Sequence, residues 1–137
     1  MKKIILIVVL AQIISCSGQS DENCHLKVKI LNSSTKVIYF GGAGSTPGIG
    51  YNPLKSGTYF KMTPDASYDD IFSRHRGCYE DFFEESNNKQ YYLLYDEEIL
   101  LNNTWEDIRA NDMVLKRYSF TLEEMQEVNW TIIYDGN

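Results

Sequence analysis

The chain has 137 residues, which is the length of a single ordinary domain, and a formal net charge of −6. An acidic surface repels phosphates and anionic headgroups, so the charge argues against a nucleic-acid partner and against electrostatic binding to a membrane surface. Aromatic residues make up 13% of the chain, a share that excludes a disordered polypeptide and indicates a folded domain.

The amino-terminal segment has the organisation of a bacterial export signal. Lys2 and Lys3 provide a cationic start, and residues 4–14 are apolar at every position except Gln12. This apolar stretch is shorter than the roughly 20 residues that a membrane-spanning helix needs. We therefore expect residues 1–15 to be a signal peptide that is removed.

Residues 13–16, Ile-Ile-Ser-Cys, resemble the lipobox of bacterial lipoproteins. The resemblance implies that Cys16 carries lipid, including an acyl chain such as palmitate, and becomes the first residue of the mature protein. Removal of residues 1–15 from the 137 leaves 122 residues, and the loss of two lysines takes the net charge from −6 to −8. We expect residues 16–23 to be the lipidated cysteine and a tether, and residues 24–137 to be one globular domain at the outer membrane, on its periplasmic or its outer face. A soluble secreted form and a cytoplasmic chain are the alternatives.

Two cysteines remain once Cys16 has been assigned to lipid. In an exported, oxidising compartment, Cys24 and Cys78 favour a disulfide. It would close a loop of about 55 residues and could stabilise the fold by roughly 4 kcal/mol in the chain-entropy model. Two free thiols are the alternative. We expect no metal or cofactor, because His25 and His75 do not combine with the cysteines in a zinc-binding spacing.

Alternating and β-branched apolar residues predict six short strands, and a seventh is compatible with the pattern. The six segments are residues 25–31, 37–40, 58–62, 90–95, 113–120 and 130–134. The first should bury Leu26, Val28 and Ile30 and form a hairpin with the second through turn-forming residues 32–34. Residues 90–95 are nearly all apolar, which predicts a central strand covered on both faces.

Two short helices are predicted in the last third of the chain. Thr104 with Asp107 approximates an N-cap pair for a helix at residues 105–110, and Thr121 with Glu124 forms a capping box for a second helix. The second helix should pack three residues at helical spacing into the core, namely Leu122, Met125 and Val128. Residues 79–85 could form one or two further helical turns or an aromatic bulge. We expect a mainly β fold, an antiparallel β-sandwich or curved sheet with two short carboxy-terminal helices, and an α+β fold is the alternative.

Two segments resemble ligand-binding loops only in part. Residues 41–50 contain five of the nine glycines but lack the complete dinucleotide, P-loop and hydrolase-elbow patterns, so we expect a long connection between sheets. Residues 65–70 place oxygen ligands as a calcium loop does, but Asp70 stands where a glycine is needed and Arg76 where a glutamate is needed. We expect a solvated polar loop there.

Four motifs in the carboxy-terminal third carry a family resemblance. They are Trp105-Glu106-Asp107-Ile108, Leu115-Lys116-Arg117-Tyr118, Thr121-Leu122-Glu123-Glu124 and Asn129-Trp130-Thr131-Ile132-Ile133-Tyr134. With the lipobox, they resemble a group of small, uncharacterised lipoproteins of Bacteroidota. The resemblance runs from Tyr91 onward, implies export, and carries no catalytic residue.

Three functions are compatible with these features. We expect a lipid-anchored, non-enzymatic protein that binds a protein or glycan partner through its many aromatic side chains. The alternative is an inhibitor or immunity-type protein against an exported toxin or peptidase, with residues 41–50 as an inserting loop. An envelope hydrolase is a third hypothesis, in which Asp69 with Glu80, or Asp96 with Glu98, would serve as acid and base.

Overall fold

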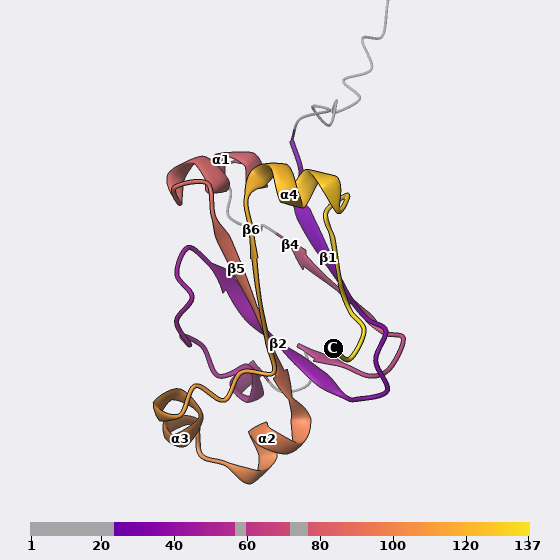
Figure 1. Ribbon diagram of the computed structural model, residues 1–137, viewed down its shortest axis with the longest axis vertical. Helices are drawn as coiled ribbons and strands as arrows, with labels where there is room; N and C mark the ends of the chain where they lie inside the picture. Colours follow the sequence, from indigo (N-terminus) through magenta and orange to yellow (C-terminus); the bar gives the residue numbers. More distant parts are fainter. Residues whose placement is uncertain (1–23, 57–59, 72–76) are drawn as a thin grey trace, which may run out of the picture.

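Figure 1 shows the computed structural model, which describes residues 24–56, 60–71 and 77–137. The described residues form seven strands in two sheets together with four α-helices, so the predicted mainly β fold is confirmed. The predicted signal peptide, Cys16 and the tether lie outside the described residues, as do His75 and Arg76. Within the described ranges, no helix has the length and apolar character needed to cross a membrane.

Sheet A joins the first and the last strands of the described chain. Its order is β4 (Ser67–Ile71), β1 (Lys27–Asn32) and β7 (Thr131–Tyr134). β1 is central, antiparallel to β4 and parallel to β7. The parallel pair departs from the predicted antiparallel arrangement, because these two strands are joined through most of the chain and not by a hairpin turn.

The alternation along β1 is confirmed, with one exception. Val28 and Ile30 are fully buried, whereas Lys27 and Lys29 are exposed. Leu26 was expected on the buried face, but it precedes the strand and is 56% exposed.

Sheet B is antiparallel throughout. Its order is β3 (Lys61–Met62), β2 (Ile38–Gly44), β5 (Gln90–Asp96) and β6 (Lys116–Phe120). Side chains of β5 alternate between two cores. Tyr92 and Leu94 pack between the sheets, and Leu93 and Tyr95 pack on the outer face against residues of the helices. The predicted central strand with cover on both faces is confirmed.

Five short helices complete the described fold. They are η1 (Pro53–Ser56), α1 (Tyr79–Glu85), α2 (Glu97–Asn102), α3 (Trp105–Ala110) and α4 (Leu122–Glu127). Figure 1 places α1 and α4 at one end of the molecule and α2 and α3 at the other. Leu100 of α2 and Ile108 of α3 are buried in the outer core of sheet B.

The capping signals identified two of these helices correctly. Thr104 Oγ1 accepts a hydrogen bond from the backbone N–H of Asp107 at 3.1 Å, and Thr121 and Glu124 form the predicted reciprocal box. The expected core stripe of α4 is wrong at one position, because the helix ends at Glu127 and Val128 is 38% exposed.

Helix α2 was not predicted. Asp96 Oδ1 accepts a hydrogen bond from the backbone N–H of Glu98 at 2.8 Å, so Asp96 is the N-cap of α2. Asp96 is therefore both the last residue of β5 and the cap of the following helix.

The predicted hairpin between residues 25–31 and 37–40 is wrong, because β1 and β2 belong to different sheets. Asn32 is fully buried where the chain leaves β1. Its side-chain amide donates to the carbonyls of Lys36 and Met62, at 2.8 and 3.2 Å, and its Oδ1 accepts hydrogen bonds from Ser34. These bonds turn the chain out of sheet A and into sheet B, so the turn-forming residues make a crossover.

The glycine-rich segment 41–50 begins inside a strand and does not connect two sheets. Gly41–Gly44 belong to β2, which is irregular between Phe40 and Ala43 opposite β5. The rest of the segment leads to η1 and then to β3 of the same sheet. Gly41 is required by packing, because a Cβ there would lie 2.1 Å from Cε2 of Tyr95.

The polar run at residues 65–70 is mostly strand, and the prediction of a solvated loop is wrong. Ser67–Ile71 form β4, which pairs with β1 along five residues. Tyr68 packs against the main core, and Asp69 faces the other way and pairs with Lys27 at 3.1 Å. β4 lies at the edge of sheet A, where a strand can carry polar side chains such as Asp69 on its outward face.

We predict that Gly41→Ala destabilises the protein by about 1–3 kcal/mol, because the added methyl must displace the Tyr95 ring. Gly44→Ala in the same strand is the matched control, since a Cβ there meets no atom within 4 Å. Urea unfolding of both variants gives the two free energies. Equal losses at the two positions would show that the Tyr95 contact is not the cause.

Candidate functional site

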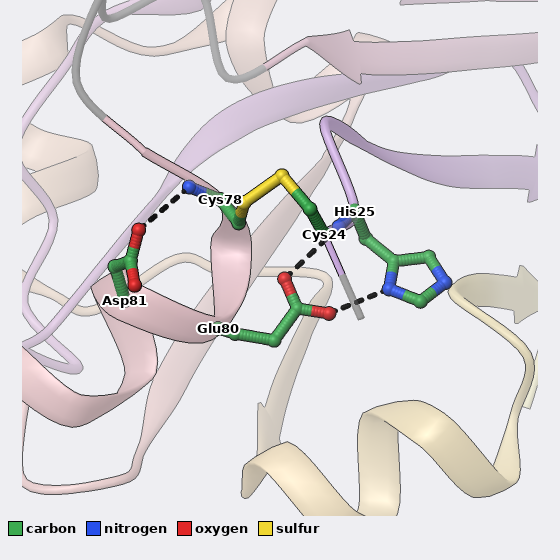
Figure 2. Close-up of a disulfide and its surroundings, with 5 residues drawn as sticks. All are labelled: Cys24, His25, Cys78, Glu80 and Asp81. Atoms are coloured by element: carbon green, nitrogen blue, oxygen red, sulfur yellow. Dashed lines mark hydrogen bonds and ion pairs between the residues drawn. A yellow bond between two sulfur atoms is a disulfide. The ribbon is translucent and has the colours of Figure 1, made fainter. Parts of the chain in front are cut away.

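The start of the described chain is fastened to α1 by the predicted disulfide, which is confirmed (Figure 2). Cys24 and Cys78 are bonded, with their Cα atoms 5.0 Å apart. Cys78 precedes the first residue of α1, and its backbone N–H donates to the Asp81 carboxylate at 2.9 Å. The backbone N–H of Tyr79 donates to the carbonyl of His25 at 2.8 Å. Residue 24 is thereby held at the α1 end of the molecule.

His25 extends this attachment to the strand that closes the fold. Glu80 accepts a hydrogen bond from the His25 backbone N–H at 3.0 Å, and a second carboxylate oxygen lies 2.6 Å from Nδ1 of the ring (Figure 2). The ring stacks on Trp130 with centroids 4.2 Å apart. Trp130 is buried and directly precedes β7. We call the disulfide, His25, Glu80 and Trp130 the amino-terminal clamp.

Three of the four carboxylates that could serve as acid–base pairs are held in other contacts. Asp69 pairs with Lys27, and Glu80 belongs to the clamp. Asp96 pairs with Lys36 at 2.9 Å while it caps α2. Burial raises the pKa of Asp96, but the hydrogen bonds from Lys36 and from the α2 backbone outweigh that effect and lower the pKa below its ordinary value. These groups support local structure in the described part of the chain.

A half-buried carboxylate that the sequence did not mark as an acid–base candidate is Asp70. Burial raises its pKa, and the hydroxyl of Tyr79 donates a hydrogen bond to Oδ2 at 2.8 Å. The inward-facing alternation of Tyr68 and Asp70 in β4 is the signal that could have identified it. A raised carboxyl pKa is a property of general acids, but Asp70 lines none of the three surface hollows described next.

Two of these hollows are small. One, of about 260 Å³, is lined by residues 35–37 and 96–98 and contains the Lys36–Asp96 ion pair. The other, also about 260 Å³, lies over the glycine-rich part of β2 and is bordered by Leu93 and Tyr51. Arg117 Nε donates to the carbonyl of Pro47 at 2.9 Å and ties the glycine-rich loop to β6.

The third hollow is apolar and lies between the outer strands of the two sheets. It has a volume of about 410 Å³ and is lined by Tyr118, Phe120, Val128, Thr131, Ile132 and Ile133, which we call the edge groove. β6 ends sheet B on this side, and β7 ends sheet A. The hydroxyl of Tyr118 donates across the groove to the carbonyl of Ile133 at 2.9 Å. Ile133 is 53% exposed.

Three ionisable residues lie at or beside the edge groove, namely Tyr118, Asp135 and Lys116. Burial raises the pKa of Tyr118 to about 12, and the nearby Asp135 adds to the shift. A hydrogen bond from the Asn137 backbone lowers the pKa of Asp135. Lys116 lies 5.8 Å from the centre of the Tyr118 ring and donates to the carbonyl of Asn137.

Sequence reasoning located the disulfide but not the edge groove. No group of three His, Cys, Asp or Glu side chains arranged to hold a metal occurs in the described residues. Comparisons with protein families, with curated proteins and with solved structures found no match to this chain.

We predict that the double variant Cys24→Ser with Cys78→Ser loses about 4 kcal/mol of unfolding free energy, because the disulfide closes a loop with a sequence separation of 54. Urea unfolding of the oxidised protein, the reduced protein and the variant measures the loss. Dithiothreitol should destabilise the natural chain and leave the variant unchanged. An unfolding midpoint of the natural chain that ignores dithiothreitol would contradict the prediction.

We predict that substitutions of Asp70 and Asp96 change the stability of the protein in opposite directions, each in a pH-dependent way. The pKa of Asp70 is higher in the folded than in the unfolded chain, so its ionised form opposes folding. Asp70→Asn should therefore be more stable than the natural chain at neutral pH, and the gain should shrink as the pH falls toward about 4. The pKa of Asp96 is lowered, so Asp96→Asn should lose stability at neutral pH and the loss should shrink in acid. Unfolding midpoints across the pH range test both signs, and the same sign for both variants would refute the assignment.

Proposed function

We propose that this chain is an exported, lipid-anchored envelope protein whose domain acts by binding a partner and not by catalysis. The observation that carries the proposal is the disulfide between Cys24 and Cys78, since disulfides persist in oxidising compartments outside the cytosol. The lipobox-like cysteine, Cys16, precedes Cys24 by only a short polar segment. An export signal and a disulfide-bonded domain are mutually consistent.

The amino-terminal clamp supports a defined orientation for such an anchored domain. Cys24 lies eight positions after Cys16, and this stretch spans at most about 29 Å when extended. Because Cys24 is bonded at α1 and His25 stacks beside β7, the end that carries α1 and α4 would face the bilayer (Figure 1). That end presents six exposed carboxylates, namely Asp81, Glu84, Glu85, Glu123, Glu124 and Glu127. Anionic headgroups would repel them, so the domain would stand away from the membrane with its sides accessible.

The edge groove supports binding as the activity of this domain. Val128 and Ile133 are exposed at its surface, and contiguous exposed apolar surface in soluble domains commonly marks an interaction site. Three of the four carboxylates considered for acid–base catalysis, Asp69, Glu80 and Asp96, are held by Lys27, His25 and Lys36 respectively. An inhibitor of an exported toxin or peptidase would be one form of such a binding protein.

We predict that bacterial cells expressing the full-length protein incorporate labelled palmitate into it and retain it in the membrane fraction. Cys16→Ala should abolish the label and release the protein, whereas the double variant Cys24→Ser with Cys78→Ser should keep the label. Protease treatment of intact cells then distinguishes the outer from the periplasmic face. A mass spectrum of the natural protein with an unmodified Cys16 would overturn the anchoring proposal.

A further inference from the structure

We propose that the edge groove holds an acyl chain carried by Cys16 of the same molecule whenever that acyl chain is not inserted in a bilayer. The inference rests on the proposed lipidation of Cys16 and names the occupant of the groove before anchoring. Three observations carry it: the groove is apolar, the polar groups of its lining are engaged within the chain, and the described chain begins beside it.

The lining of the groove suits a hydrocarbon. Four of its six residues are Phe, Val or Ile, and none is charged. Phe120 packs against the main core, and Ile132 is buried in it, so the groove continues the interior of the sandwich to the surface. Its volume of about 410 Å³ falls within the range of about 300–1,000 Å³ of sites that bury small ligands. A single acyl chain laid there would remove apolar surface of Val128 and Ile133 from water, which is favourable.

The polar groups of the lining residues leave little for a polar ligand to bind. The hydroxyl of Tyr118 donates to the carbonyl of Ile133 at 2.9 Å. The backbone N–H of Thr131 donates to the carbonyl of Val128 at 3.0 Å, and its hydroxyl donates to the carbonyl of Asn129 at 3.2 Å. A polar ligand loses hydrogen bonds to water on entering such a groove without gaining equivalent ones. A hydrocarbon chain has none to lose.

The charges beside the groove do not select a charged head group. Lys116 lies at the Tyr118 ring, but its ammonium donates to the carbonyl of Asn137 at 2.9 Å and interacts electrostatically with Asp135. A cation and an anion thus lie close together at this position. An acyl chain attached through a protein residue brings no ionic head group that would need either of them.

The described chain begins next to the groove. The ring of His25 stacks on Trp130 with centroids 4.2 Å apart, and Trp130 directly precedes Thr131, a residue of the lining. Cys16 precedes Cys24 by eight positions, which span at most about 29 Å. A short link gives a ligand an effective concentration of about the millimolar range. In dilute protein, an acyl chain on Cys16 therefore fills the groove of its own molecule in preference to that of another.

Occupancy by the acyl chain would couple the groove to anchoring. The acyl chain and an external partner compete for the same surface, and a bilayer removes the acyl chain from that competition. The groove is then covered before insertion and open afterwards. A partner that uses the edge groove would bind the anchored protein more tightly than the unanchored one.

The test uses bacteria that express the full-length chain and grow with a palmitate analogue containing a photoreactive diazirine. The purified lipidated protein is irradiated in dilute solution after removal of detergent, and the crosslinked residues are identified by mass spectrometry. We expect crosslinks in the segment that contains Val128, Ile132 and Ile133. Phospholipid vesicles added before irradiation should reduce them by about tenfold or more, because the bilayer takes up the acyl chain. Admixed heavy-isotope protein with ordinary palmitate reports any crosslink between molecules.

Two variants locate the acyl chain. Ile133→Lys should reduce the crosslinks in the groove by about tenfold, because it replaces an apolar wall of the groove with a charged side chain. Leu101→Lys is the matched control, since Leu101 is 66% exposed on α2 at the opposite end of the molecule and its substitution changes the net charge equally (Figure 1). Urea unfolding of both variants verifies that the fold is retained.

Crosslinks on the heavy-isotope molecules, crosslinks confined to residues outside the groove, or crosslinks that the two variants reduce equally would each overturn the inference. Labelled protein without crosslinks in the groove would leave the anchored protein standing and remove only this occupant. A Cys16 that carries no palmitate would overturn the anchoring proposal, and the inference with it.

Discussion

The attachment of the first described residues to α1 and to Trp130 is the constraint on which the remaining proposals depend. The disulfide fixes Cys24 to the start of α1, and the ring of His25 between Glu80 and Trp130 links that helix to the beginning of β7. One short segment thus sets where the preceding chain leaves the domain and where the last strand begins. The proposed orientation of an anchored domain rests on this attachment.

Short-range patterns in the sequence, such as capping residues and apolar runs, correctly predicted several of the helices and strands. The capping residues Thr104 and Thr121 located α3 and α4, and the continuous apolar run in β5 indicated a strand covered on both faces. The hairpin prediction failed at Asn32 because its side-chain amide donates hydrogen bonds to the carbonyls of Lys36 and of the distant Met62, and these bonds decide which way the chain turns there. Turn-forming residues favour a change of chain direction, but tertiary contacts determine which sheet the chain enters after the turn.

The disulfide could be predicted because the expected lipidation of Cys16 leaves two cysteines, which allow a single pairing. The edge groove could not, because it depends on which strands end the two sheets, and strand order is a property of the assembled fold. Val128 illustrates the difficulty. Its spacing in the helical pattern suggests a core residue, but α4 ends one residue earlier and the side chain is left at the border of the groove.

The position of β1 between β4 and β7 also determines when the domain can become stable. Lys29 in β1 is opposite Thr131 in β7, so sheet A has only two strands until nearly the whole chain is available, and a two-stranded ribbon is marginally stable in water. Contacts between residues so distant in sequence raise the contact order and slow folding. During synthesis from the amino terminus, sheet A can therefore be completed only after β7 has been made.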